Sequence, residues 1–204
     1  MHRIITIGRE FGSGGREIGK LLAEELDFAY YDKEIISAIA ERSKMAEDYV
    51  NQIVENQVHV PYPITVGVSM NTSMDGSFYS VNQSIFAAQS EILEELADRS
   101  DCVIVGRCAD YILASRHPFR IFVYADMAHK LARCRAMGED GDGLSDKELE
   151  KRIRSIDKAR AQYYLFCTGG THDNRLTYDL GINTSTVSIP DAVSIIAALV
   201  RAQK

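Results

Sequence analysis

The chain has 204 residues, of which 46% are hydrophobic, and a formal net charge of −6 at pH 7. This length and apolar content suffice for one substantial core, so we expect a single domain. The acidic balance argues against a general nucleic-acid or membrane-surface binder, because both need a basic face. No apolar run approaches the roughly 20 residues needed to span a bilayer, and no signal peptide is apparent at the N-terminus. We therefore expect a cytoplasmic protein with no membrane partner.

Five short runs rich in branched apolar residues predict β-strands, at 3–8, 28–31, 102–106, 120–125 and 178–183. Each run is nearly continuous in apolar character, which is typical of a parallel sheet covered on both faces. Helical patterns accompany them, at 16–26, 33–43, 45–56, 83–99, 127–138, 145–166 and 190–203. The alternation predicts right-handed crossovers and a three-layer α/β fold. Residues 57–82 are rich in Pro, Gly, Ser, Thr and Asn, and we expect a long loop or small insertion there.

The first predicted strand runs into a glycine-rich loop, and a helix follows at once. The glycines are Gly8, Gly12, Gly14 and Gly15. Glycines let backbone N–H groups turn inward, and a helix N-terminus adds a partial positive charge, so the segment suits an anion. A strand–helix turn without a ligand is the simpler interpretation, but four glycines cost chain entropy that such a turn does not need.

The loop departs from the usual phosphate-loop pattern G-x-x-x-x-G-K-[ST]. Counted from Gly14, the lysine position holds Gly15 and the hydroxyl position holds Arg16. Arg16 could supply the cation, because a guanidinium binds phosphate bidentately, whereas Lys20 is a weaker substitute. Ser13 lies on the wrong side of the loop for the usual magnesium role. Glu17 could contact a metal through water or only cap the helix.

A dinucleotide-binding loop is the other pattern that these glycines suggest. The sequence G-x-G-x-x-G would start at Gly12, but its third glycine position holds Glu17. Asp32 follows the second predicted strand at about the spacing of a ribose-binding acid, which keeps an NAD-type function open. The motifs farther along the chain argue against it.

Residues 102–126, CVIVGRCADYILASRHPFRIFVYAD, resemble the cytidylate kinases in the Gly106-Arg107 step after a strand and in the Ala125-Asp126 ending of the next. The loop GSGG resembles their Gly-Ser-Gly-Lys loop, and YDLGINTSTVSIPDAVSIIAAL resembles their last strand and closing helix. The more specific resemblance is to the cytidylate kinase-like family, in REFGSGGREIG, YYDKEII, VIVGRCADYIL and DKARAQYY. It covers nearly the whole chain except 57–82.

This resemblance implies a P-loop nucleoside-monophosphate-kinase-like domain over 1–204 with a five-stranded parallel sheet. The core would comprise 1–31, 100–144 and 176–204, with an acceptor-binding lobe at 32–99 and a lid at 145–175. It implies a cytoplasmic kinase that uses ATP and Mg²⁺ and acts on small-molecule nucleotides, CMP-like or otherwise. The magnesium ligands have no assignment. Residues 57–82 could pair two subunits as a homodimer.

The resemblance also implies roles for individual residues. Gly12, Ser13, Gly14 and Gly15 match the donor phosphate loop. Asp32 matches an acid that opens the acceptor-binding helices, and Arg107 matches an arginine that grips the acceptor phosphate. Asp110 is displaced from the family's aspartate by Cys108-Ala109. Asp157 and Arg160 match the Asp-x-x-Arg of the lid, and Arg152 or Arg154 could be an earlier lid arginine.

We therefore expect three sets of functional residues. The catalytic set is Arg16, Arg154 and Arg160. The nucleotide-binding set is Gly12, Ser13, Gly14, Gly15, Arg16 and Glu17. The acceptor-binding set is Asp32, Arg107, Asp110 and Asp157. The cations of EKRIRSIDKARAQYY could equally lie on a solvated helix face. The alternative function is a nucleotide-binding regulatory or sensor protein with a degenerate loop, which the missing lysine and hydroxyl favour.

The four cysteines (Cys102, Cys108, Cys134 and Cys167) form no CxxC pair and no metal-finger spacing. We expect free thiols rather than disulfides.

Overall fold

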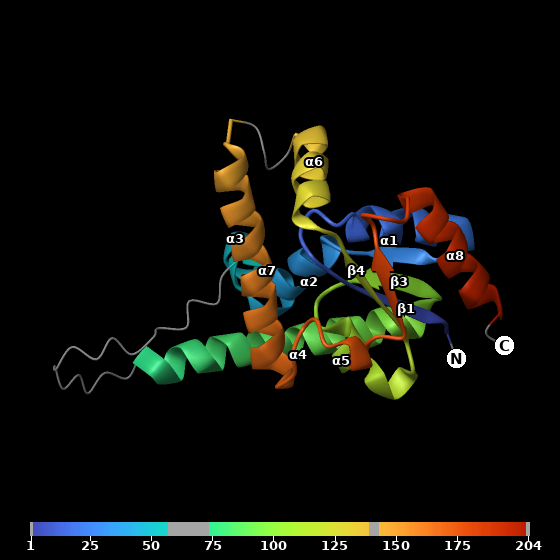
Figure 1. Cartoon of the computed structure of the whole chain (residues 1–204). Coiled ribbons are helices and arrows are strands. Elements are labelled where there is room, and N and C mark those ends of the chain that lie inside the picture. The colour runs from blue at the N-terminus through green and yellow to red at the C-terminus, as the bar shows by residue number, and fades with distance from the viewer. Residues whose placement is uncertain (1, 57–73, 139–142, 203–204) are drawn as a thin grey trace.

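The computed structural model describes residues 2–56, 74–138 and 143–202 (Figure 1). The predicted five-stranded parallel sheet is confirmed. Its strands are β1 (Ile4–Arg9), β2 (Ala29–Tyr31), β3 (Cys102–Val105), β4 (Phe119–Tyr124) and β5 (Leu180–Asn183). They are parallel, in the order β2-β3-β1-β4-β5. Because β1 is the central strand, the glycine loop that follows it lies in the middle of the carboxyl edge of the sheet, where open α/β sheets bind ligands.

The α-helices are α1 (Gly15–Leu26), α2 (Glu34–Ser43), α3 (Glu47–Asn51), α4 (Met74–Arg99), α5 (Ala109–Ile112), α6 (Met127–Met137), α7 (Asp146–Thr168) and α8 (Ile189–Ala202). A π-helical turn, η1 (Gln52–Asn56), continues α3, and short 3₁₀ turns lie at η2 (Ala114–Arg116) and η3 (Arg175–Thr177). In the described ranges, no helix combines the length and apolarity that crossing a bilayer requires.

Helices cover both faces of the sheet, because successive strand residues point to opposite sides. Val103 and Val105 pack with α1 and α8, whereas Cys102 and Ile104 pack with α2, α3, α4 and the C-terminal part of α7. Figure 1 shows α1 and α8 on one side of the strands and the long α4 along the other. The predicted three-layer architecture is confirmed.

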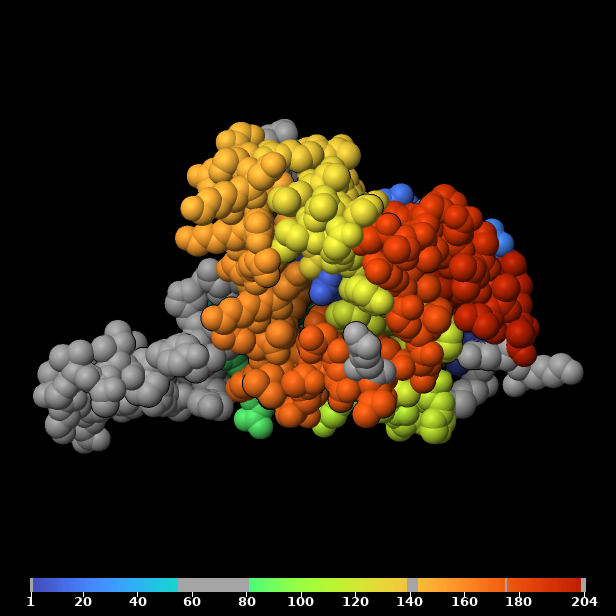
Figure 2. All heavy atoms as spheres, viewed as in Figure 1, coloured from blue at the N-terminus to red at the C-terminus, as the bar shows by residue number. Residues whose placement is uncertain are grey.

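Helices α6 and α7 form a separate pair that rises above the carboxyl edge of the sheet (Figures 1 and 2). Their shared core is small: Cys134, Leu149 and Ile153 are buried there. Phe11 of the glycine loop packs against this core. The pair therefore contacts the loop directly, although it is distant from the loop in the sequence.

One predicted boundary is wrong. The composition of residues 57–82 predicts a loop or insertion, but α4 begins at Met74. Extending an existing helix adds one hydrogen bond for each residue ordered, so propagation from a stable segment overrides the weak local preference of Ser, Gly and Asn. Residues 57–73 lie outside the described part of the chain.

Candidate functional site

The loop between β1 and α1 is held in shape by its own backbone and by a distant turn. Gly12 and Gly14 have φ of 74° and 83°, in the left-handed region. The Ser13 hydroxyl donates to the Glu10 carbonyl at 2.8 Å, and Thr184 Oγ1 donates to the Ser13 carbonyl at 2.8 Å. Gly14 is the N-cap of α1 and has no side chain to cap the first helical N–H groups. These N–H groups are the physical basis of an anion site.

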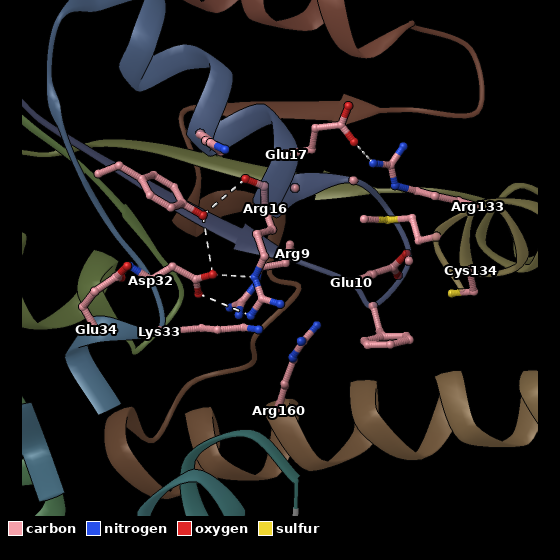
Figure 3. A pocket seen from close by; sticks show the side chains of 17 residues that line it. Arg9, Glu10, Arg16, Glu17, Asp32, Lys33, Glu34, Arg133, Cys134 and Arg160 are labelled. Carbon is pink, nitrogen blue, oxygen red and sulfur yellow. Dashed lines mark hydrogen bonds and ion pairs between the residues drawn. The ribbon is translucent and has the colours of Figure 1, made fainter. Parts of the chain in front are cut away.

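The loop lines a cavity of about 610 Å³ (Figure 3). Its cationic side chains are Arg9, Arg16, Lys20, Lys33, Arg133 and Arg160, and its acidic ones are Glu10, Glu17, Asp32 and Glu34. The cavity therefore carries an excess of positive charge in a protein whose net charge is −6. A concave site with convergent cations suits a polyanionic ligand.

Arg16 and Asp32 form an ion pair on one wall of this cavity. The Arg16 Nε contacts Asp32 Oδ2, and its Nη2 donates to Oδ1 at 3.4 Å. The Tyr30 hydroxyl donates to Asp32 Oδ2 at 3.4 Å (Figure 3). Burial, and next the Asp32 charge, raise the pKa of Tyr30, so its hydroxyl stays a donor at neutral pH. Asp32 is thereby fixed beside the first turn of α1.

Lys130, Glu10 and Asp157 join α6 and α7 to the loop. The Lys130 ammonium lies 2.7 Å from Glu10 Oε2 and 3.1 Å from Asp157 Oδ2. The Phe11 N–H donates to Asp157 Oδ1 at 2.6 Å. Burial raises the pKa of Asp157 above its ordinary value, and the hydrogen bond from the Phe11 N–H and the charge of Lys130 offset only part of this effect. Asp157 therefore positions the loop backbone, and its carboxylate is already engaged by protein groups.

Arg160 extends from α7 toward the loop (Figure 3). Its Cζ lies 5.6 Å from the centroid of the Phe11 ring, and its Nη1 lies 4.0 Å from Asp157 Oδ1. Arg154, on the same helix, is different: its side chain is 67% exposed and ion-pairs with Glu150 at 2.7 Å.

Arg107 lies at the end of β3 in an unusual backbone. Gly106, Arg107 and Cys108 have consecutive positive φ values of 73°, 61° and 51°. Non-glycine residues rarely adopt this conformation, and such strain concentrates at functional sites. Gln89 of α4 supports the segment, because its Nε2 donates to the Arg107 carbonyl at 2.8 Å while its Oε1 accepts from Tyr163 at 3.1 Å.

A smaller hollow beside Arg107 contains Asp110 and His172. Asp110 accepts a hydrogen bond from the Tyr164 hydroxyl at 2.6 Å, and burial raises its pKa. Burial, and then the charges of Arg9 and Arg160, lower the pKa of His172 to about 4. The imidazole is therefore neutral at physiological pH.

The sequence profile of the cytidylate kinase-like family matches residues 4–186. The chain belongs to the cytidylate kinase-like family. No relative was found among the curated protein sequences.

Solved structures similar to this cytidylate kinase-like chain include an uncharacterised protein from Eubacterium ventriosum ATCC 27560, 24% identical with a TM-score of 0.72 over 99% of this chain and 100% of that one. A shikimate kinase from Acinetobacter baumannii, solved in complex with shikimate, is 16% identical with a TM-score of 0.55 over 100% and 96%. A shikimate kinase from Bacteroides thetaiotaomicron is 16% identical with a TM-score of 0.56 over 98% of each chain. Identities this low establish the fold, which is that of the P-loop kinases.

The expected site residues of this cytidylate kinase-like chain fall into four places. Gly12, Gly14, Gly15, Arg16, Glu17, Asp32 and Arg160 line the large cavity. Arg107 and Asp110 line the smaller hollow, which Arg160 also borders. Ser13 and Asp157 are engaged within the loop and its support, and Arg154 lies on the exposed face of α7. The functional roles of all these residues stay predictions.

Three cavity cations were missed in the sequence analysis: Arg9, Lys33 and Arg133. Arg133 ion-pairs with Glu17 and lies against Gly14, where an added Cβ would be 3.2 Å from its Cζ. No local pattern identifies Arg133, because it reaches the loop only through the packing of α6. Arg9 had a signal: it stands at the first glycine position of the phosphate-loop pattern.

Kinases of this kind use a nucleotide together with Mg²⁺. Among the described residues, no three His, Cys, Asp or Glu side chains cluster as a metal site. Glu10, Glu17 and Asp32 each ion-pair with a separate cation. The described residues therefore do not form a prebuilt magnesium site. The glycine loop and its cations, in contrast, fit a nucleotide's phosphates.

Proposed function

We propose that this protein transfers the γ-phosphoryl group of ATP to a nucleoside monophosphate, CMP-like, or to another small acceptor. One observation carries the proposal: a glycine loop at a helix N-terminus faces a cavity of about 610 Å³ with six cationic side chains. Those cations come from β1, α1, α6, α7 and the segment before α2. Phosphoryl transfer needs this convergence, since catalysis is mainly positioning and stabilisation of phosphate charge.

The backbone N–H groups of Gly12–Gly15 and the first turn of α1 would hold the donor phosphates. Glu17 would adjoin them through its place in that turn. Asp32 and Arg107 would orient the acceptor, and Arg160 would stabilise the charge on the transferring group. Arg16 supports this arrangement through its ion pair with Asp32. Both Arg107 and Arg160 border the smaller hollow, which favours a place for them on the acceptor side.

In the transfer step, an acceptor oxygen forms a bond to the γ-phosphorus. The bond between that phosphorus and the oxygen that bridges the β- and γ-phosphates breaks. ADP leaves with the electron pair of that bond. A monophosphate acceptor attacks with an ionised oxygen and needs no base. A hydroxyl acceptor must lose a proton, and Asp32, a carboxylate that lines the cavity, would accept it.

Residues 145–175 would act as a lid and residues 32–99 as an acceptor lobe. The small core shared by α6 and the N-terminal half of α7 supports a movable element there, because few buried apolar contacts resist local movement. Tyr163 and Tyr164, near the end of α7, are buried in the main core and would anchor the lid. Closure of such an element excludes water from the transferring phosphoryl group. Asp157 and Lys130 would then couple lid position to the loop.

A nucleotide-binding sensor is the second candidate. Gly15 and Arg16 replace the usual lysine and hydroxyl residue of the phosphate loop, which favours binding without efficient transfer. The cavity cations beyond the loop disfavour this function, because a sensor has no transition state to stabilise.

An assay of ADP formation tests the proposal and separates the two candidates. The protein is incubated with ATP, Mg²⁺ and a panel of nucleoside monophosphates, with shikimate added because a structural neighbour binds it. We expect acceptor-dependent ADP, reduced about 10²- to 10³-fold in Arg160→Ala, because a cation at the transferring group is lost. Arg201→Ala on α8 is the control, since Arg201 ion-pairs with Glu25 and does not line the cavity.

Bound ATP without turnover across the panel would favour the sensor. The change Arg16→Ala distinguishes two roles for this residue. If Arg16 contacts the donor phosphates, its loss raises the Kd for ATP. If Arg16 only supports Asp32, its loss raises the KM for the acceptor. Arg154→Ala tests whether that exposed side chain contributes at all.

A further inference from the structure

The phosphate loop of this chain carries two complementary replacements. With Gly14 as its second glycine, the pattern G-x-x-x-x-G-K-[ST] puts glycine at position 9 and lysine at position 15. This chain has Arg9 and Gly15 instead. The lysine of the pattern is therefore missing at position 15, and an arginine stands at position 9, where the pattern has a glycine.

The two positions are in contact in the folded loop. A Cβ built on Gly15 would lie 2.7 Å from the Cβ of Arg9 and 3.3 Å from both its Cγ and the Cβ of Val123. The shorter distance is too close for real carbon atoms. The aliphatic stem of Arg9 thus occupies the room that a side chain at position 15 would need, so a lysine there is incompatible with Arg9.

The guanidinium of Arg9 lies at the meeting point of the site's two hollows. A Cβ built on Gly106 would be 2.9 Å from Arg9 Cζ, so the group rests against the backbone at the end of β3. Arg9 lines both the large cavity and the smaller hollow beside Arg107, although only 6% of the residue is exposed. Figure 3 shows Arg9 next to the Arg16 side chain.

We propose that Arg9 is the cation that binds the β- and γ-phosphates of the donor nucleotide, in the role that lysine has in the usual loop. This inference rests on the proposed nucleotide site. Arg9 is better placed for this role than Arg16, because Arg9 lines both hollows, whereas Arg16 lines the large cavity and not the smaller hollow. A buried guanidinium in this position gains bidentate hydrogen bonds when a polyphosphate enters.

The test measures equilibrium binding of ATP, ADP and AMP by calorimetry for five proteins. They are the native chain, Arg9→Met, Arg9→Lys, Gly15→Lys and the double change Arg9→Gly/Gly15→Lys. We expect Arg9→Met to weaken ATP and ADP binding about 10- to 100-fold, the cost of a charge-assisted hydrogen bond. AMP binding should change little, because AMP lacks the β- and γ-phosphates. Arg9→Lys should recover most of the loss.

The double change puts back the glycine and the lysine of the ordinary pattern, with Arg16 still at the hydroxyl position, and should bind ATP more tightly than Arg9→Met. Gly15→Lys alone should bind ATP more weakly than the native chain, because Arg9 fills the space. Thermal unfolding of each variant without ligand controls for folding. Equal weakening of ATP, ADP and AMP in Arg9→Met would mean a structural role and overturn the inference, as would unchanged ATP binding.

Binding and transfer are read separately, so the two proposals fail in different ways. If the native chain binds ATP in an Arg9-dependent manner without transferring phosphate, the inference stands and the kinase function falls. If it binds neither ATP nor inorganic tripolyphosphate, both fall.

Discussion

Gly14 is a loop position at which both the backbone conformation and the neighbouring atoms disfavour a side chain. Its φ is 83°, and a Cβ there would lie 2.8 Å from Ile189 Cδ1 and 3.2 Å from Arg133 Cζ. An added methyl group therefore meets both a strained backbone and side chains that border the anion site. Gly143 offers a matched comparison, because its φ is also 83° but nothing lies within 4 Å of an added Cβ.

We predict that Gly14→Ala weakens ATP binding at least about 10-fold, while Gly143→Ala leaves it unchanged. Both changes should cost about 1–2 kcal/mol in unfolding free energy, from the left-handed backbone alone. Gly14→Ala should cost more, because Ile189 and Arg133 must move. Calorimetric titration and urea denaturation of both variants check this. Equal ATP affinity in the two would contradict a phosphate-binding role for the loop.

At the scale of elements, α6 and α7 are tied to the loop by charge rather than by a large apolar interface. The Lys130 side chain is 6% exposed and contacts acids from the loop and from α7. Breaking one partner of such a set leaves a poorly solvated charge behind, which is costly. The ion pair between Arg154 and Glu150, in contrast, is exposed on α7.

We predict that a double-mutant cycle of Lys130→Met and Asp157→Asn gives a coupling energy of about 1–3 kcal/mol. The same cycle for Arg154→Met and Glu150→Gln should give about 0.3–0.5 kcal/mol, as for other helical surface pairs. Urea denaturation of the single and double variants supplies the values. A Lys130–Asp157 coupling as small as the surface one would show that charge does not hold the pair of helices to the loop.

For the whole molecule, the carboxyl edge of the sheet gathers buried ionisable groups whose titration enters the global stability. His172 is the clearest case. Its ring lies 5.4 Å from both the Phe122 and Tyr164 rings, and its pKa of about 4 lies below the 6.5 of an exposed histidine. Burial and the neighbouring Arg9 and Arg160 disfavour the imidazolium.

We predict a pH-dependent contribution of His172 to unfolding free energy. Because the unfolded chain binds the proton first, the contribution is fully present above about pH 6.5 and is lost as pH falls toward 4. Its size should be on the order of 1–3 kcal/mol. His172→Phe keeps an aromatic ring and removes the titration. As pH falls from 6.5 toward 4, the unfolding free energy of the native chain should therefore fall relative to that of the variant. A constant difference in urea denaturation from pH 4 to 7 would contradict the assignment.

Much of the fold was predictable because its signals are local. All five strands were predicted within two residues of their observed bounds, since a buried parallel strand is marked by a continuous branched apolar run. The start of α4 was not predictable, because residues 74–82 carry no helical apolar stripe of their own. The absence of disulfides among the described residues agrees with the expectation from cysteine spacing.

The candidate site was predictable only in part. Glycine spacing indicated the anion loop, and family resemblance indicated Asp32, Arg107 and Arg160. The engagement of Asp157 by Phe11 was not foreseeable, because the two residues are 146 positions apart in the sequence. The role of Arg9 was overlooked because the end of a buried strand is ordinarily core.

The parallel α/β class, the glycine loop before α1 and the family followed from the sequence alone, because periodicity, glycine spacing and short motifs are properties of neighbouring residues. Only the tertiary structure decided which cations meet at the loop. Arg9, Arg133 and Arg160 come from β1, α6 and α7, and crossover connections bring these elements to one edge of the sheet. The missing lysine is visible in the sequence itself. Its proposed replacement by Arg9 is not, because it depends on the contact between positions 9 and 15 in the folded loop.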